Sequence, residues 1–165
     1  MIFLTVGTQF PFDRLVMAVD HLFEEGLMPE DVFGQIGAST HKPRHFETVV
    51  SLEKNAYDDR FRQASAIISH AGMGAITMAL DQSKPLLVMP RQRKYREVVN
   101  DHQEAVADRF EALGHILVAR DGAQLAEKVA RLRSFVPRPR KAEPEAVAQK
   151  VRHFLDLLVQ TRRLL

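Results

Sequence analysis

Residues 67–90 carry the clearest pattern of the chain and read IISHAGMGAITMALDQSKPLLVMP. An apolar run stops at a polar pair, two glycines and a segment of helical period follow, and a second apolar run ends at Pro90. Short continuous apolar runs are typical of strands that are buried on both faces of a sheet. Parallel strands need a crossover, which is usually a helix. The stretch therefore predicts a strand, a helix and a second strand at the centre of a parallel sheet.

The same alternation continues on both sides of that stretch. We expect strands at residues 2–6, 31–36, 66–69, 86–89 and 115–119, and we consider a further strand at 47–52. We expect helices at residues 12–25, 58–64, 73–82, 100–113 and 121–132. Gly114 suits a left-handed helix end, and Asp121 suits a helix N-cap. The alternation predicts an α/β fold, a Rossmann-like parallel sheet with helices on both faces.

The length of 165 residues suits one domain, which we place at residues 1–136, and a tail at 137–165. Two prolines at the start of the tail break the chain, and Pro144 can open a final helix to about residue 163. The apolar residues of that helix keep one stripe: Val147, Val151, Phe154, Leu155, Leu158 and Val159. This stripe either covers the chain's own sheet or docks a partner protein.

The composition is that of a soluble globular protein, with 45% apolar and 27% charged residues. The absence of cysteine excludes disulfides and thiolate metal sites, and it fits a reducing compartment. We find no sequence motif for a metal site or for an activated nucleophile. A net charge of +2 is too small to indicate a nucleic acid as a partner.

The first residues, MIFLTVGTQF, lack the features of a signal peptide, because they have no basic start and their apolar run ends at Val6. No window approaches the ~18 apolar residues of a membrane-spanning helix. We therefore expect that any membrane association comes through a surface or a partner.

Ligands of open parallel sheets bind outside the carboxyl ends of the strands. Five loops begin at those ends, at Gly7, Gly37, Ser69, Pro90 and Ala119. In the loop Gly7-Thr8-Gln9, glycine allows the backbone to approach a phosphate or a sugar closely, although a simple turn explains the same residues.

The loop after Ser69 and His70 contains two glycines and opens a helix. The first N–H groups of a helix have no partner within it, and the helix dipole adds roughly half a positive charge there. A phosphate binds readily at such a helix start, and His70 adds a hydrogen-bond donor. The pattern is neither a Walker loop nor a complete dinucleotide fingerprint, and a packing turn is the alternative.

Basic and polar residues follow Pro90. The basic residues nearest the candidate anion site are Arg91, Arg93, Lys94 and Arg96. A second basic stretch, between residues 131 and 141, is typical of solvated loops. The polar residues that could hydrogen-bond a sugar are Asn100, Asp101, His102 and Gln103. Simple capping of the following helix by Asn100 or Asp101 accounts for two of them.

Several segments of the chain resemble the carboxyl-terminal domain of glycosyltransferase family 28. They read MIFLTVGTQ and FDRLV near the start, IISHAGMGAI and KPLLVMPR in the middle, and NDHQ at 100–103. The nearest resemblance is to the small catalytic subunits of two-component transferases. These are bacterial exopolysaccharide subunits and the cytosolic half of the eukaryotic enzyme that adds the second N-acetylglucosamine to dolichol diphosphate. The resemblance covers residues 1 to about 120.

This resemblance implies the donor-binding, carboxyl-terminal half of a GT-B glycosyltransferase. In that family the segment matching His70–Ala75 holds the donor diphosphate, and the loop matching Gly7–Gln9 lines the same cleft. The positions matching His102 and Gln103 face the donor sugar. The substrate-binding residues that we predict are Gly7, Thr8, Gln9, Ser69, His70, Gly72, Met73, Gly74, Ala75, Met78, Arg91, Asp101, His102 and Gln103.

The implied function is that of a UDP-sugar-binding subunit of an inverting transferase that acts on a lipid-linked glycan, with no cofactor or metal. Because the acceptor-binding half is missing, the resemblance implies a membrane-anchored partner at the inner face of the membrane. That partner would recruit the acceptor and could supply the catalytic base, so we name no base. Two alternatives are a non-catalytic scaffold that lost donor binding and a free-standing nucleotide-sugar enzyme.

The sequence departs from the family pattern at four positions. Met78 stands where the family has a glutamate that hydrogen-bonds the ribose hydroxyls. Losing that bond weakens nucleotide binding by roughly tenfold to a hundredfold. Arg96, Val98 and Asn100 replace a glycine, a histidine and an aspartate of the exopolysaccharide subunits. Arg96 adds positive charge that an acidic donor sugar would complement.

Overall fold

The computed structural model describes residues 1–140, 145, 148–149 and 151–154. Residues 1–140 fold into a six-stranded parallel sheet with the strand order β3-β2-β1-β4-β5-β6. The strands are β1 (Ile2–Thr5), β2 (Val32–Gln35), β3 (Glu47–Val49), β4 (Ala66–His70), β5 (Leu86–Met89) and β6 (Leu117–Val118). This order reverses between β1 and β4, and ligands of such sheets bind at that switch point. The predicted fold class is confirmed.

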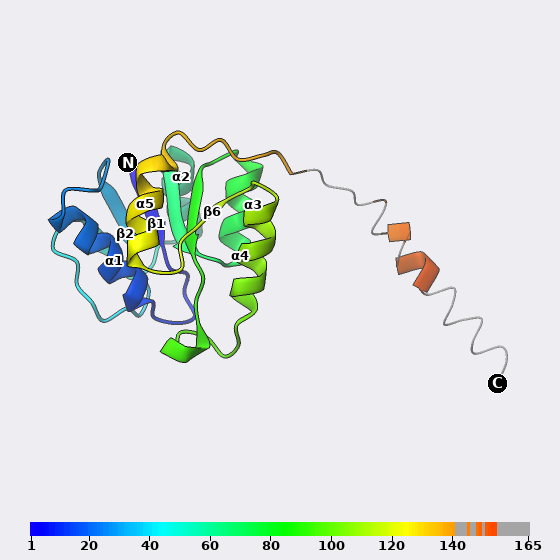
Figure 1. Ribbon diagram of the computed structural model, residues 1–165, viewed down its shortest axis with the longest axis horizontal. Coiled ribbons are helices and arrows are strands. Elements are labelled where there is room, and N and C mark those ends of the chain that lie inside the picture. The colour runs from blue at the N-terminus through cyan, green and yellow to red at the C-terminus, as the bar shows by residue number, and fades with distance from the viewer. Residues whose placement is uncertain (141–144, 146–147, 150, 155–165) are drawn as a thin grey trace.

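The helices cover both faces of the sheet (Figure 1). They are α1 (Asp13–Glu24), α2 (Lys54–Gln63), α3 (Met73–Asp81), α4 (His102–Ala112) and α5 (Gly122–Leu132). One buried cluster joins α1 and α5 to one face of the sheet, and a second joins α2, α3 and α4 to the other face. None of the described helices is long and apolar enough to cross a membrane.

The predicted elements agree with the structure except near some ends. Helix α2 begins at Lys54, four residues before its predicted start, because residues 54–56 are exposed and only Tyr57 of the first turn packs against the core. Strands β3 and β6 are shorter than their predicted segments. Gly114 has a φ of +72°, and Asp121 accepts a hydrogen bond from the Gln124 N–H at 2.8 Å, so both predicted helix ends are confirmed.

A short 3₁₀ helix, η1 (Arg93–Tyr95), lies between β5 and α4 and has no counterpart among the predicted elements. Arg96 ends it in the left-handed conformation, with a φ of +58° and a ψ of +28°. A side chain with a Cβ is strained there, whereas glycine is not. The replacement of a family glycine by Arg96 therefore falls at a position whose backbone favours glycine.

Most of the predicted final helix, at residues 144–163, lies outside the described residues. Residues 145, 148–149 and 151–154 are described and are helical. Within the apolar stripe, the described side chains of Val151 and Phe154 are more than half exposed. Val147, Leu155, Leu158 and Val159 lie outside the described residues, so the choice between a docking helix and a cover for the sheet stays a prediction.

Candidate functional site

The loop between β4 and α3 presents free backbone N–H groups at the centre of the sheet edge. Gly72 is the N-cap of α3, and no side chain caps the helix. The first helical hydrogen bond runs from the Ile76 N–H to the Gly72 carbonyl at 3.1 Å. The N–H groups of Met73, Gly74 and Ala75 therefore have no partner within the helix. With the helix dipole, they form a site that suits an anion.

The two glycines of this loop are there for different reasons. A Cβ at Gly72 would lie 2.2 Å from Nε2 of His70, so the imidazole leaves no room for a side chain. A Cβ at Gly74 would meet no atom within 4 Å. The protein itself therefore requires glycine at Gly72 only. The open space above Gly74 is available to a ligand that approaches the helix start.

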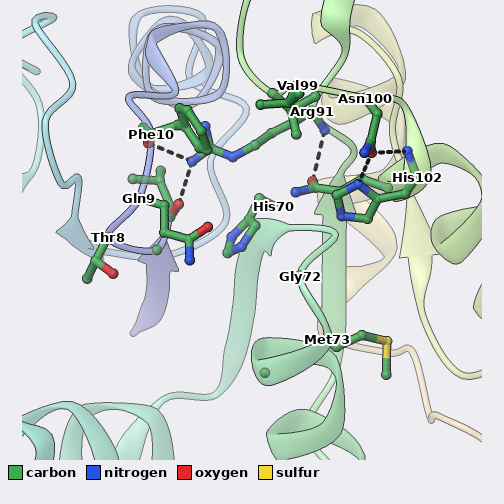
Figure 2. Close-up of a pocket in the computed structure, with 15 residues that line it drawn as sticks. Thr8, Gln9, Phe10, His70, Gly72, Met73, Arg91, Val99, Asn100 and His102 are labelled. Carbon is green, nitrogen blue, oxygen red and sulfur yellow. Dashed lines mark hydrogen bonds between the residues drawn. The ribbon is translucent and has the colours of Figure 1, made fainter.

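The imidazole of His70 lies between two backbone segments (Figure 2). On the side opposite Gly72, a Cβ at Gly7 would lie 2.9 Å from Cε1 of His70. Gly7 also has a φ of +74°, which strains any residue with a side chain. Glycine is therefore needed at this position for two reasons: the turn after β1 requires a positive φ, and the His70 ring leaves no room for a side chain. The loop after β1 thus lies against the start of α3.

The hydrogen bonds of His70 indicate which of its ring nitrogens carries the proton and which is an acceptor. The Ser69 hydroxyl donates to the Thr5 carbonyl at 2.8 Å, so its oxygen is free to accept from Nδ1 of His70 at 3.2 Å. Assigned from this network, the neutral ring carries its proton on Nδ1, and Nε2 is an acceptor. Burial and the nearby positive charge of Arg91 lower the pKa of His70 to about 4. At neutral pH His70 offers Nε2 as an acceptor, rather than the donor expected from the sequence.

A cavity of about 430 Å³ opens above this helix start. Its walls come from the loops after β1, β4 and β5 (Figure 2). The lining residues are Val6, Gly7, Thr8, Gln9, Phe10, His70, Gly72, Met73, Gly74, Arg91, Val98, Val99, Asn100, His102 and Gln103. We call this the first cavity. Its polar side chains suit a ligand with several hydroxyl groups.

A second cavity, of about 520 Å³, lies on the other side of the helix start. It shares Gly7, Thr8, His70 and Gly74 with the first cavity. Its other lining residues are Thr5, Gln35, Leu52, Lys54, Tyr57, Ala75 and Met78. The two cavities therefore meet over the free N–H groups of α3. One ligand with a central anionic group could occupy both.

Arg91 reaches the first cavity, but its guanidinium is occupied by the backbone. Its Nη1 and Nη2 donate to the carbonyls of Val6, Phe10, Pro11 and Glu97 at 2.6–3.2 Å. The side chain is 3% exposed, and burial lowers its pKa to about 10, so it stays charged at neutral pH. Three of the carbonyls belong to the loop after β1. Arg91 therefore positions the wall of the cavity that contains Thr8 and Gln9.

Glu97 connects Arg91, and the loop after β1 that Arg91 holds, to Arg14 of helix α1. Its carboxylate accepts both Nε and Nη2 of Arg14 at 2.8 Å, and it also accepts the Gln92 N–H at 3.0 Å. Arg14 also donates to the carbonyls of Pro90 and Arg120. The buried Arg91 and Glu97 and the partly buried Arg14 form a network that ties together the loops after β1, β5 and β6. We call it the arginine network.

The structure separates the predicted site residues into three groups. Lining the cavities are Gly7, Thr8, Gln9, His70, Gly72, Met73, Gly74, Ala75, Met78, Arg91, His102 and Gln103. Ser69 is fully buried below His70 and supports it. Asp101 lines neither cavity, because its carboxylate accepts the Arg93 N–H at 2.7 Å and faces a groove with Gln92 and Glu104. Gln103 reaches inward, and its Oε1 accepts the Arg91 N–H.

The expected positive charge beside the sugar position is not found there. Arg96 lines a separate groove next to α1, with Arg14 and Met17, rather than the first cavity. Lys94 lines the groove that contains Asp101. Because Arg91 is bound to carbonyls, none of these three cations is a free donor in the first cavity. Lys94 lies in η1 and Arg96 ends it, and both side chains line grooves outside the first cavity.

Several lining residues were not among the predicted site residues. Val6, Phe10, Val98 and Val99 line the first cavity, and Thr5, Gln35, Leu52, Lys54 and Tyr57 line the second. Asn100, which the sequence offered as a sugar-binding candidate, also lines the first cavity. A signal existed for Thr5 and Gln35, which are polar residues at the ends of apolar strands. Leu52, Lys54 and Tyr57 have no such signal. Within the described part of the chain, no group of three or more His, Asp or Glu side chains could hold a metal ion.

The chain is similar in sequence to known proteins. The subunit ALG13 of UDP-N-acetylglucosamine transferase from Homo sapiens is 33% identical over 124 residues, 70% of this chain and 10% of that protein. The ALG13 subunit from Eremothecium gossypii is 45% identical over 69 residues, 41% of this chain and 32% of that protein. The chain therefore spans a third or less of the length of these relatives.

Solved structures share the fold. The NMR structure of ALG13 has a TM-score of 0.58 at 19% identity, over 87% of this chain and 91% of that one. The calicheamicin glycosyltransferase CalG4 has a TM-score of 0.58 at 20% identity, over 81% of this chain and 34% of that one. The family profile of the glycosyltransferase family 28 C-terminal domain matches residues 1–158. With its parallel sheet and its helix start between two cavities, the chain belongs to the glycosyltransferase family 28 C-terminal domain family.

Proposed function

We propose that this chain is the UDP-sugar-binding subunit of an inverting two-component glycosyltransferase that acts on a lipid-linked glycan. The observation that carries the proposal is the meeting of two cavities over the uncapped start of α3. A nucleotide sugar has a matching layout, with a diphosphate between a nucleoside and a sugar. The names of the ALG13 relatives, which are transferase subunits, support the same function.

In this proposal the diphosphate lies on the N–H groups of Met73, Gly74 and Ala75. The nucleoside occupies the second cavity, which is the more apolar, with Leu52, Tyr57 and Met78 in its walls. The sugar occupies the first cavity, beside Asn100, His102 and Gln103. Met78 places an apolar thioether in the nucleoside cavity, so binding there relies on shape and on polar groups of the sheet.

The protonation state of His70 affects how this site binds a diphosphate. Nε2 of the neutral ring is an acceptor and repels a phosphate oxygen, whereas the imidazolium would donate to it. A bound diphosphate stabilises the charged ring and therefore raises the pKa of His70. We infer that donor binding takes up a proton at His70. The backbone N–H groups and this imidazolium would then stabilise the departing diphosphate.

We propose that a second protein takes part in the reaction, as the subunit names of the ALG13 relatives suggest. A GT-B enzyme has two domains, and this chain supplies the donor half. We propose a membrane-anchored partner that binds the lipid-linked acceptor at the cytoplasmic face and supplies the catalytic base. Exopolysaccharide or glycolipid synthesis is the pathway class that fits such an acceptor. The chain itself would be cytoplasmic and peripheral to the membrane.

A competing function is that of a scaffold that kept the fold and lost the donor. The specific observation in its favour is Met78, which offers no acceptor to ribose hydroxyls. Calorimetry with UDP and with UDP-sugars, on the chain alone and with its co-expressed partner, tests both functions. We expect micromolar to millimolar binding of at least one UDP-sugar, unchanged by a metal chelator. No binding of any of them in the complex would rule out the donor-binding function.

A matched pair of variants refines this test. Met78→Glu lies in the nucleoside cavity, while Met73→Glu lies in the sugar cavity at a half-exposed position. If only the ribose contact is missing, Met78→Glu raises UDP affinity about tenfold, from a charged hydrogen bond. Met73→Glu should weaken binding, because its carboxylate lies near the diphosphate. If neither wild type nor Met78→Glu binds UDP, the scaffold function is favoured.

A further inference from the structure

A row of polar side chains crosses the otherwise apolar face of the sheet that carries α2 and α3. Thr5 of β1 pairs in register with Gln35 of β2 and with Ser69 of β4. Two residues earlier on the same face, Phe3 pairs with Phe33, and their rings stack at 6.3 Å. On β1 and β2 the side chains thus change from aromatic to polar at the same position along the sheet. Thr5, Gln35 and Ser69 therefore form one polar floor at the carboxyl edge of the sheet.

Two members of this row have hydrogen-bonding atoms without partners. Gln35 is 3% exposed and Thr5 is 1% exposed. By distance and angle, neither Oε1 of Gln35 nor Oγ1 of Thr5 has a hydrogen-bond partner among the described residues, although the Tyr57 phenol lies near the Thr5 side chain. Ser69, in contrast, donates to the Thr5 carbonyl. If the amide of Gln35 were turned over, its NH₂ group would be the buried group without a partner.

Buried polar groups without partners are rare and unfavourable, and they need an explanation. The described residues contain four such side-chain atoms, and two of them, on Thr5 and Gln35, belong to residues that line the second cavity. A strand position that faces apolar helices is better filled by valine or leucine for stability alone. The two side chains are therefore explained best by a polar partner that enters the cavity from outside the chain.

We propose that Gln35, assisted by Thr5, recognises the base of the bound nucleotide through the hydrogen-bonding edge of a planar amide. This inference rests on the proposed function, because it assigns the base to the second cavity. The primary amide of Gln35 presents one acceptor and one donor side by side, which matches the N3–H and O4 edge of uracil. The phenol ring of Tyr57 lines the same cavity and can cover a face of the base.

The position of the floor fits the rest of the ligand. Gly7, Thr8, His70 and Gly74 line the second cavity at its border with the first. A nucleoside whose diphosphate lies at the α3 start therefore extends toward Gln35 and Tyr57. Because Gln35 and Thr5 are held by parallel strand pairing, the floor does not depend on loop closure.

The test uses the full chain, the substitution Gln35→Leu and three ligands: UDP, its N3-methyl analogue and pyrophosphate. Calorimetry of wild type should show UDP binding about tenfold tighter than the N3-methyl analogue, since one hydrogen bond is lost. In Gln35→Leu, UDP affinity should fall about tenfold, to that of the analogue, and pyrophosphate affinity should not change. Thr5→Val should give a smaller loss of UDP affinity.

Controls separate recognition from folding. Gln82→Leu, at an exposed residue after α3, should leave all three affinities unchanged. Gln35→Leu should melt no lower than wild type, because it removes a buried group without a partner. If UDP binds and Gln35→Leu still binds UDP about tenfold more tightly than the N3-methyl analogue, the inference is wrong. The polar row would then contact only water. If wild type binds pyrophosphate but neither UDP nor any UDP-sugar, the proposed function fails, and this inference fails with it.

Discussion

The two cavities that meet at the start of α3 are built from different parts of the molecule. The first is enclosed by loops, whose positions depend on the arginine network of Arg14, Glu97 and Arg91. The second stands on the sheet, where Thr5 and Gln35 are neighbours through strand pairing. A single side chain can therefore deform the first cavity. The sheet floor of the second should keep its shape and change only in its hydrogen-bonding groups, while its border at Gly7 and Thr8 belongs to the same loop as the wall of the first.

The largest expected effect is on the loop-built cavity. Arg91→Met leaves four carbonyls without their donor. We expect the free energy of unfolding to fall by about 3 kcal/mol or more, measured by urea denaturation. Donor binding should be lost as well. Arg93→Met, two residues away with an exposed side chain, should stay within about 0.5 kcal/mol of wild type. Equal stability of the two variants would contradict the supporting role of Arg91.

The next effect separates the two glycines at the border of the cavities. Gly74→Ala should raise the unfolding free energy by about 0.5–1 kcal/mol, because alanine favours the helix and its Cβ meets open space. Its Cβ should nevertheless lower UDP-sugar affinity about tenfold or more, because it occupies the ligand's approach to the α3 start. A Gly74→Ala protein with unchanged affinity would show that the diphosphate does not lie there.

Gly72→Ala is the matched comparison. Its Cβ would lie 2.2 Å from Nε2 of His70, so the imidazole must move or the loop must shift. We expect lower stability together with lower affinity, in contrast to the opposite signs for Gly74→Ala. Thermal unfolding and calorimetry on the two variants measure both quantities.

A third effect is the pH dependence centred on His70. The pKa of His70 is about 4 in the folded chain, below its ordinary value of 6.5, so the unfolded state takes up this proton first as pH falls. The stability contributed by the neutral ring is therefore present above pH 6.5 and is lost as pH falls toward 4. UDP-N-acetylglucosamine affinity should move the other way and rise several-fold from pH 7.5 to pH 5.5, because the diphosphate favours the imidazolium.

His70→Asn is the control for the pH dependence of stability and for the pH dependence of affinity. An amide does not titrate in this range, so the variant should lose the pH dependence of affinity and most of this part of the pH dependence of stability. Calorimetry at the two pH values measures the first quantity, and urea denaturation across pH 4 to 7 measures the second. An unchanged affinity slope in His70→Asn would assign the proton to another group.

The smallest effect lies outside both cavities. Arg96 has a left-handed backbone, with a φ of +58°, and its side chain lines the groove beside α1. Arg96→Gly should raise the unfolding free energy by about 1 kcal/mol through relief of that strain, with no change in donor affinity. A clear loss of affinity would mean that the loop after β5 depends on the arginine for its shape and would weaken the contrast between the two cavities.

Much of the fold follows from local pattern. The apolar run at residues 67–68, the glycines at Gly72 and Gly74, and the run that ends at Pro90 predict β4, α3 and β5 because strand and helix periods are properties of short segments. The anion site at the α3 start is also local, since any helix leaves its first N–H groups free. Helix α2 was predicted four residues short because residues 54–56 are exposed, and Tyr57 alone does not establish a helical apolar period.

The sequence by itself therefore determined the order of strands and helices and the place of the candidate site at the carboxyl edge. Only the tertiary structure decided what each polar side chain does there. Arg91 donates to three carbonyls that are 80–85 residues away in sequence, and Asp101 turns toward η1. Thr5 and Gln35 become neighbours only when β1 and β2 pair. Hydrogen bonds between distant segments depend on packing, and no short pattern of residues encodes that packing.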